Sequence, residues 1–142
     1  MTIGAVMRTR VVTVAPTDSA RLAVLRMLEE EVGSVAVCED GRLVGIFTER
    51  DVLALSGDGG DLDRVLVRDV MTRGPVTVSA DVAVLDAARL MGERRIRHLP
   101  VVEGENLLGM AGIRDVLGSL VERLWHTHDE DAHDAVRALS KG

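Results

Sequence analysis

The sequence contains the same stretch twice, and this duplication constrains the fold more than any other feature. Residues 45–53 read Gly-Ile-Phe-Thr-Glu-Arg-Asp-Val-Leu, and residues 109–117, 64 positions further on, read Gly-Met-Ala-Gly-Ile-Arg-Asp-Val-Leu. The same offset aligns Met7 with Met71, and no gap is needed from position 6 to position 53. We therefore expect two copies of one structural unit.

Each copy predicts the order strand, helix, strand, strand, helix. In the first copy, β-branched and apolar patterns indicate strands at 11–14, 35–38 and 43–47 and helices at 20–31 and 49–55. In the second copy, they indicate strands at 76–78, 99–102 and 107–111 and helices at 83–94 and 113–125. Thr17 or Asp18 is the expected N-cap of the first helix, and Asp40-Gly41 the expected hairpin turn. A short helical turn is expected within 61–70, and 135–142 has the pattern of a further short helix.

The fold class that follows is α+β, with two β-α-β-β-α motifs in a pseudo-twofold arrangement. Three strands are too few to enclose a core, so we expect the two sheets to pack against each other. The predicted division is motif 1 at 5–55, a linker at 56–69, motif 2 at 70–120 and a C-terminal helix or tail at 121–142.

Composition narrows the function classes. The chain is 46% hydrophobic and 28% charged, which is typical of a globular protein, and it has a net charge of −6, which argues against nucleic-acid and membrane partners. Aromatic residues make up only 1%, so a site built on base stacking is not expected. The single Cys38, and the lack of a long apolar run or a signal-peptide pattern, predict a cytoplasmic protein.

The duplicated motifs, taken in order, resemble the CBS domain, which is named after cystathionine β-synthase. The resemblance rests on Gly-Ser-Val-Ala-Val (33–37), Arg-His-Leu-Pro-Val (97–101), the Asp-Gly hairpin and Leu-Val-Gly-Ile-Phe-Thr-Glu-Arg-Asp (43–51), and it covers about residues 5–120. It implies a stand-alone regulatory CBS pair and energy sensor that needs no cofactor. Such a pair binds AMP, ADP, ATP or S-adenosylmethionine in the clefts between the motifs, forms a homodimer and signals to an effector protein by a conformational or dimer change.

The resemblance also assigns candidate residues. The family's ribose-binding aspartate corresponds to Asp51 and Asp115, and its neighbouring hydroxyl to Thr48, with Gly112 at that place in the second copy. The family's base-binding elements correspond to Thr13, Val14, Ser34 and Val35 in the first copy and to Thr77, Val78, Leu99 and Pro100 in the second. The candidate phosphate-binding residues are Arg50, Arg97, His98 and Arg114.

The chemistry of these side chains suits the implied roles. A carboxylate accepts two hydrogen bonds from a vicinal diol, and arginine binds phosphate through two parallel donors. Residues 93–98 form a basic island in an acidic chain, which would attract an anionic ligand.

A structural role competes with ribose binding at Asp51. Thr48 and Asp51 have the spacing of a capping box, in which the side chains satisfy the first backbone donors of a helix. Gly112 lacks the capping hydroxyl while Asp115 is retained, so a pure capping role explains the second copy less well. An acid in a first helical turn still gains from the helix dipole.

The sequence shows no nucleophile triad, no Walker loop and no metal triad, so we do not expect an enzyme. Two alternatives to the nucleotide sensor stay open. One is a non-catalytic dimerisation module with empty clefts, and the other is a metal or redox sensor that uses Cys38 or the His-rich stretch 126–133. The spacing of those histidines is not a zinc pattern, so a solvated tail is expected there.

Overall fold

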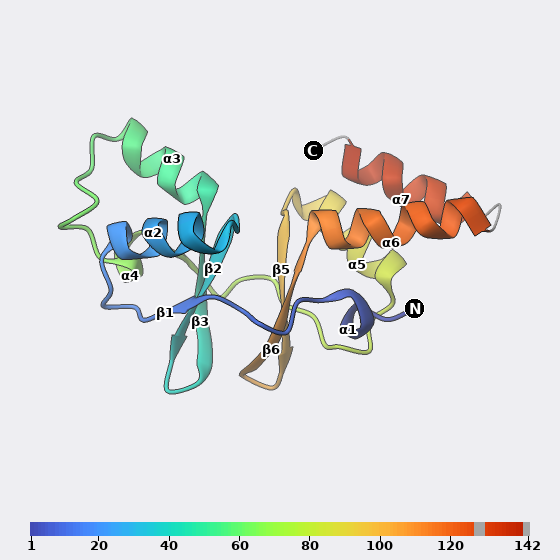
Figure 1. Cartoon of the computed structure of the whole chain (residues 1–142), viewed down its shortest axis with the longest axis horizontal. Coiled ribbons are helices and arrows are strands. Elements are labelled where there is room, and N and C mark those ends of the chain that lie inside the picture. Colours follow the sequence, from blue (N-terminus) through green and yellow to red (C-terminus); the bar gives the residue numbers. More distant parts are fainter. Residues whose placement is uncertain (127–129, 141–142) are drawn as a thin grey trace. The chain divides into compact units, whose positions relative to one another are not determined.

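A computed structural model of the chain describes residues 1–126 and 130–140 (Figure 1). It confirms the α+β class. The chain divides into two compact units: Arg10–Pro75 forms one, and Met1–Thr9 together with Val76–Gly142 forms the other. The motif boundaries derived from the sequence repeat stay a prediction; the units are described below one at a time.

The unit Arg10–Pro75 is a small sheet with helices packed on it. Its elements are β1 (Thr13–Val14), α2 (Ala20–Glu30), β2 (Ser34–Glu39), β3 (Arg42–Thr48), α3 (Glu49–Gly57), α4 (Val67–Val70) and β4 (Thr72–Arg73). β1 runs parallel to β2, whereas β3 is antiparallel to both β2 and β4. The hairpin between β2 and β3 turns at Asp40 and Gly41, whose φ angles of 52° and 78° are those that a type I′ turn requires.

The second unit repeats this plan and adds a helix. Its elements are α1 (Ile3–Val6), α5 (Val84–Arg94), β5 (His98–Glu103), β6 (Asn106–Gly112), α6 (Ile113–His126) and α7 (Glu130–Ser140). β5 and β6 form an antiparallel hairpin, and α7 packs against both α5 and α6. In Figure 1, α6 and α7 are the orange and red helices near the C-terminus.

Each sequence repeat is preceded by a short segment that packs in the unit formed by the other repeat. The segment Met1–Thr9, which precedes the first repeat, belongs to the unit of the second. Arg8 pairs with Met110 on β6, and the backbone N–H groups of Ile3 and Gly4 donate to Val82 and Ala80. In the unit Arg10–Pro75, α4 and β4 follow the first repeat and complete its sheet.

Both units have an apolar core in which sheet and helices meet. In Arg10–Pro75 the core consists of Val14, Ala20, Ala23, Met27, Val35, Val37, Phe47, Leu55 and Val67. In the second unit it includes residues of α1, α5, β5 and α6, together with Ala132, Ala135 and Leu139 of α7. The helix α7 therefore belongs to the core of its unit.

Two local predictions were wrong. The N-cap of α2 is Ser19, whose Oγ accepts from the Leu22 N–H at 3.1 Å, while the Asp18 carboxylate instead accepts from the Ala15 N–H at 2.7 Å. The expected strand at 76–78 is a single parallel bridge from Val78 to Val101. The short helical turn expected within 61–70 is present as α4, at the end of that range, and residues 62–64 form turns before it.

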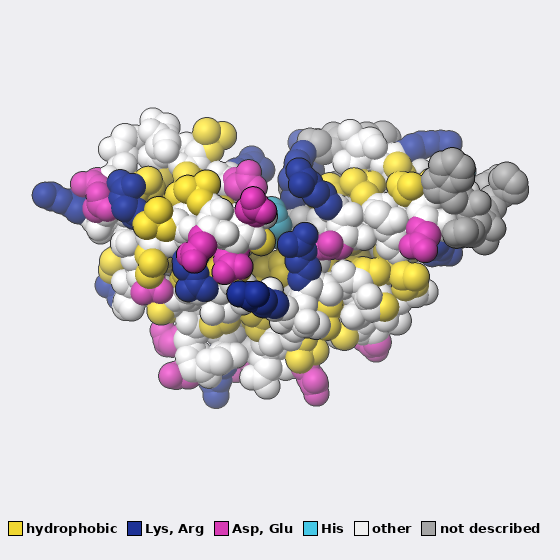
Figure 2. Space-filling view, in the orientation of Figure 1, with side chains coloured by type: hydrophobic (Ala, Val, Ile, Leu, Met, Phe, Trp, Pro, Cys, Tyr) yellow, Lys and Arg dark blue, Asp and Glu magenta, His cyan; other side chains and the backbone are white. Residues whose placement is uncertain are grey.

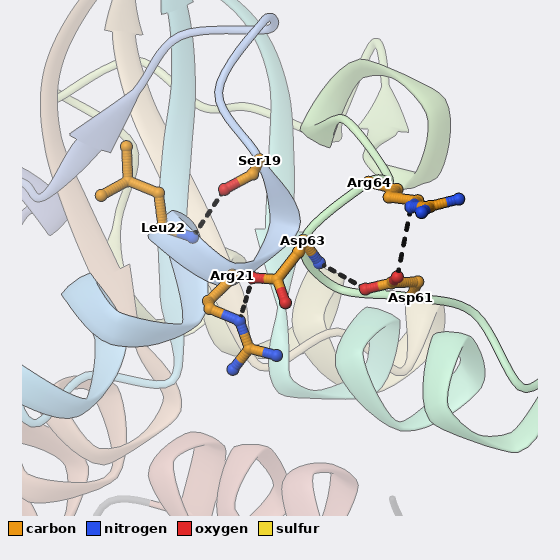
Figure 3. A network of polar contacts seen from close by, with 6 residues as sticks. All are labelled: Ser19, Arg21, Leu22, Asp61, Asp63 and Arg64. Atoms are coloured by element: carbon orange, nitrogen blue, oxygen red, sulfur yellow. Dashed lines mark hydrogen bonds and ion pairs between the residues drawn. The ribbon is translucent and has the colours of Figure 1, made fainter.

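A polar network anchors those turns to the start of α2 (Figure 3). The Arg21 guanidinium bonds to the Asp63 carboxylate through Nε, and this hydrogen bond raises the pKa of Arg21. Asp61 accepts from the Asp63 N–H at 2.9 Å, and its other oxygen lies 3.7 Å from Arg64 Nε. The network fixes the entry to α2 and orients the exposed Arg21 side chain.

Candidate ligand-binding site

In the unit Arg10–Pro75, the candidate residues gather where the β2–β3 hairpin meets α3. Ser34, the first residue of β2, pairs with Thr48, the last residue of β3. Thr48 is also the N-cap of α3, and Asp51 is the third residue of that helix. The chain thus brings Ser34, Thr48 and Asp51 together, and we call this group the first half-site.

The hydrogen bonds of Asp51 confirm the capping box. Its Oδ2 accepts from the Thr48 backbone N–H at 2.8 Å and lies 3.3 Å from the Thr48 hydroxyl oxygen. The side chain is half-buried and stands in the first turn of α3, where the helix dipole favours a negative charge. The capping role uses Oδ2, so the carboxylate has a second oxygen with which to accept.

The second unit contains a matching group, which we call the second half-site. His98, the first residue of β5, pairs with Gly112, the last residue of β6, and Asp115 lies in the first turn of α6. The Gly112 N–H donates to Asp115 Oδ2 at 3.1 Å. Asp115 therefore still caps the helix through a backbone N–H, although the hydroxyl is missing. From the sequence we expected the capping role to be weaker in this copy.

The second half-site has an additional cation. Arg8 Nε lies 3.7 Å from Asp115 Oδ2, with the Arg8 side chain 59% exposed and that of Asp115 23% exposed. Sequence reasoning missed Arg8. The 64-residue offset aligns Arg8 with Thr72, so a comparison of the two copies shows a cation that is present in one copy only. The comparison does not show that Arg8 packs beside motif 2.

The candidate residues differ in how far they are buried. The side chains of Val14, Val35 and Leu99 lie in the cores, and Pro100 is fully buried, so these residues can offer a ligand only backbone groups. Among the rest, Val78 packs against the core, Ser34 is buried and His98 half-buried, whereas the exposed ones are Thr13, Arg50, Thr77, Arg97 and Arg114.

Three of these exposed side chains, those of Arg50, Arg97 and Arg114, lie close to the half-sites along the chain. Arg50 and Arg114 are the second residues of α3 and α6, one position before Asp51 and Asp115. Arg97 directly precedes β5, and its carbonyl accepts from the Ile113 N–H at 2.9 Å, which joins it to the start of α6. Figure 2 shows basic and acidic side chains interspersed with hydrophobic ones on one face of the molecule.

The structure also bears on the alternative functions. Cys38 is a free, half-buried thiol, and burial raises its pKa. Over residues 1–126 and 130–140, no group of three or more His, Cys, Asp or Glu side chains could hold a metal ion. The prediction of a solvated His-rich tail concerns residues 126–133, of which 127–129 lie outside the described residues. Nor does any helix in that same part of the chain have the length and hydropathy to cross a membrane.

Comparison with known proteins defines the class. The CBS domain family model matches residues 3–58 and again residues 67–122, so the chain belongs to the CBS domain family. The resemblance inferred from the motifs is thereby confirmed, with two copies in tandem.

Individual relatives place the chain within that family. It is 37% identical over 110 residues to arabinose 5-phosphate isomerase KdsD of Yersinia pestis, covering 77% of this chain and only 34% of the isomerase. It is 33% identical over 110 residues to the CBS domain-containing protein YhcV of Bacillus subtilis, covering 78% of this chain and 79% of YhcV. The crystal structure of CBSX2 in complex with AMP superposes with a TM-score of 0.76 at 30% identity, covering 85% of this chain and 96% of that one.

Proposed function

We propose that this chain is a regulatory CBS pair that binds an adenosine-containing ligand, AMP, ADP, ATP or S-adenosylmethionine, at the half-sites of Asp51 and Asp115. The observation that carries the proposal is the duplicated carboxylate, held in both units beside a strand end in the first turn of a helix. Such a carboxylate can accept hydrogen bonds from the two ribose hydroxyls. The relative CBSX2, which is solved with AMP, supports this choice of ligand.

In this function the protein passes a signal to an effector protein and catalyses no reaction. CBS pairs are generally regulatory modules, and nothing in the half-sites resembles an activated nucleophile. Ligand binding would favour one of two conformations of a cytoplasmic homodimer, and an effector protein would respond to that change. The ligand can act as an energy signal only if its affinity differs between AMP, ADP and ATP.

A second candidate function is a non-catalytic dimerisation module without a ligand. The capping bonds favour this function, because Asp51 and Asp115 each accept a backbone hydrogen bond from their own chain. These bonds give both aspartates a role in stability that needs no ligand. This alternative predicts that no adenosine-containing ligand binds at either half-site.

Calorimetric titration distinguishes the two functions. AMP, ADP, ATP and S-adenosylmethionine are titrated into the wild type, Asp51→Ala and Asp115→Ala. Loss of the ribose hydrogen bonds should lower the affinity by roughly ten- to a hundredfold. Asp51→Asn serves as the matched control for folding, because its amide oxygen still accepts from the Thr48 N–H. If no ligand binds, or if both alanine variants bind as the wild type does, the sensor function is refuted.

A gain-of-function variant tests the second half-site independently. A Cβ atom added at Gly112 would lie 3.4 Å from Asp115 Oδ2, which is an ordinary van der Waals contact. Gly112→Thr can therefore reproduce the hydroxyl that Thr48 supplies to Asp51. We expect it to strengthen ligand binding at the second half-site and to leave the fold intact.

A further inference from the structure

The two units carry opposite charges at one corresponding place, the C-terminal ends of the helices α2 and α5. The helix α2 ends at Glu30 with Glu31 as its C-cap, and the 64-residue offset aligns these residues with Arg94 and Arg95 at the end of α5. The backbone is the same at both caps, with φ and ψ of 55° and 44° at Glu31 and of 54° and 45° at Arg95. The helix dipole favours a cation at this end, but α2 reaches the same geometry with two acids. Ending the helix therefore does not require the arginines of α5.

Two further arginines belong to the same surface. Arg97 lies between α5 and β5, and its carbonyl accepts from the Ile113 N–H at 2.9 Å, which joins it to the first turn of α6, where Arg114 follows. Figure 2 shows basic side chains, in dark blue, gathered over the region where Figure 1 has the upper end of β5 and the start of α6. We call the four exposed residues of this region the arginine surface: Arg94, Arg95, Arg97 and Arg114.

The arginine surface is not neutralised by its own chain. Within residues 1–126 and 130–140, the side chains of its four arginines make no hydrogen bond and no ion pair. Other arginines do pair with carboxylates of the same chain, and these include Arg8, Arg10, Arg21, Arg64, Arg89 and Arg137. The sequence has 23 acidic residues to 17 basic ones, so carboxylates are not scarce. The fold thus leaves four forked donors available to an anion from outside the chain.

The rest of the chain restricts which anion can bind there. A net charge of −6 repels a long polyanion such as a nucleic acid, and aromatic residues, which would stack its bases, make up only 1% of the chain. A short acidic peptide segment can meet the arginine surface alone and avoid the acidic remainder of the molecule. Each guanidinium can hold one carboxylate through two parallel hydrogen bonds, and clusters of arginines recognise acidic motifs in this way. An acidic protein segment therefore fits this surface best.

We propose that the arginine surface binds an Asp- and Glu-rich segment of an effector protein, and that a nucleotide at Asp115 competes with that segment. Arg97 and Arg114 are also candidate phosphate-binding residues of the second half-site, so the same two arginines serve both ligands. The segment and the nucleotide then weaken each other's binding by the same factor. The competition rests on the proposed function, whereas the binding of the acidic segment does not.

Fluorescence anisotropy with a fluorescein-labelled oligoglutamate peptide tests the surface, at an ionic strength of about 0.15 M. The wild type should bind the peptide, and the double variant Arg94→Glu with Arg95→Glu should raise the dissociation constant by about tenfold or more, because carboxylates then face the peptide. This variant repeats the acidic end of α2 in the same backbone geometry, so α5 should still fold. The matched control, Arg68→Glu with Arg73→Glu, changes the net charge equally at two exposed arginines of the other unit and should bind as the wild type does.

Two results would overturn the surface. One is a wild type that does not bind the peptide, and the other is an equal loss of affinity in the two double variants. A labelled oligothymidylate of the same length that binds more tightly than the peptide would overturn the choice of a protein segment and favour a nucleic acid.

Competition tests the link to the second half-site. Saturating ATP should raise the dissociation constant of the peptide by about threefold or more, whereas adenosine, which has no phosphate, should leave it unchanged. Inorganic triphosphate is the control for charge alone and should compete more weakly than ATP, because it lacks the ribose that Asp115 would bind. If ATP binds in calorimetry but leaves the peptide affinity unchanged, or if inorganic triphosphate competes as well as ATP, the competition is refuted and the surface stands. If calorimetry shows no nucleotide binding, the proposed function and the competition fail together, and the peptide titration alone decides the surface.

Discussion

Replacing Gly45 by alanine tests how the segment after motif 1 completes that motif. A Cβ at Gly45 would lie 2.5 Å from Met71 Sδ and 2.9 Å from the backbone oxygen of Thr72. Met71 can rotate away, but it packs against the core of its unit, and the Thr72 oxygen belongs to the segment that holds β4 on β3. An alanine at position 45 therefore displaces both the Met71 side chain and the backbone at Thr72.

The expected cost follows from these two contacts. Moving the Met71 side chain out of its site loses about 1–2 kcal/mol of apolar burial. Straining one backbone hydrogen bond between β3 and β4 loses about 1 kcal/mol more. The total of about 2–3 kcal/mol should lower the Tm by roughly 5–15 °C for a chain of this size. Urea unfolding followed by circular dichroism gives the free energy of unfolding directly.

Two comparisons make this prediction specific. Gly109→Ala should cost a similar amount, because its Cβ would lie 2.6 Å from Met7 Sδ and 2.7 Å from the Arg8 oxygen. Gly118→Ala is the matched control, since nothing lies within 4 Å of its Cβ and α6 should gain about 0.8–1 kcal/mol of helix propensity. If Gly45→Ala is as stable as the wild type, Met71 does not pack closely against Gly45 of β3. In a double-mutant cycle with Met71→Ala, strictly additive costs would argue against the contact as well.

Three further predictions follow from single sites. Asp51→Ala should lower the free energy of unfolding by about 0.5–2 kcal/mol through loss of the α3 cap, while Asp51→Asn should cost less, and equal losses in urea unfolding would contradict the cap. Gly92→Leu should displace α7 from α5 at a cost of about 1–3 kcal/mol, seen as faster hydrogen exchange in 130–140 than in the wild type; unchanged protection would show that Ala138 does not pack there. Burial raises the pKa of the Cys38 thiol, so the native state should lose stability as the pH rises above about 9, where the unfolded thiol ionises first. Urea unfolding of the wild type should show this loss and Cys38→Ser should not.

The repeat made most of the fold predictable, because apolar periodicity and turn residues are local signals. The β2–β3 hairpin and its turn at Asp40-Gly41 were predicted correctly, as were the starts of α2 and α3 at Ala20 and Glu49. The N-cap of α2 was not, since Asp18 and Ser19 are equally good capping residues and only the turn at Ala15 decides between them.

Tertiary packing accounts for what the sequence did not reveal. The placement of α1 and Arg8 beside motif 2 depends on contacts between residues about a hundred positions apart, and no local pattern encodes it. The core role of α7 was hidden because two of its three buried core residues, Ala132 and Ala135, are too small to give a strong apolar signal. At the half-sites, the sequence correctly paired Thr48 with Asp51, but it could not show that Arg8 faces Asp115.

Arg8 gives the two half-sites different charges, and this difference can be measured. If ribose binds at Asp115, its 5′-phosphate lies within reach of the long Arg8 side chain, which is 59% exposed and whose Nε is 3.7 Å from that carboxylate. The corresponding position near Asp51 holds Thr72, which has no charge. Arg8→Ala should therefore weaken AMP binding at the second half-site by roughly three- to tenfold and leave adenosine binding unchanged. Calorimetry in the Asp51→Ala background isolates that half-site, and equal losses for AMP and adenosine would mean that Arg8 only orients Asp115.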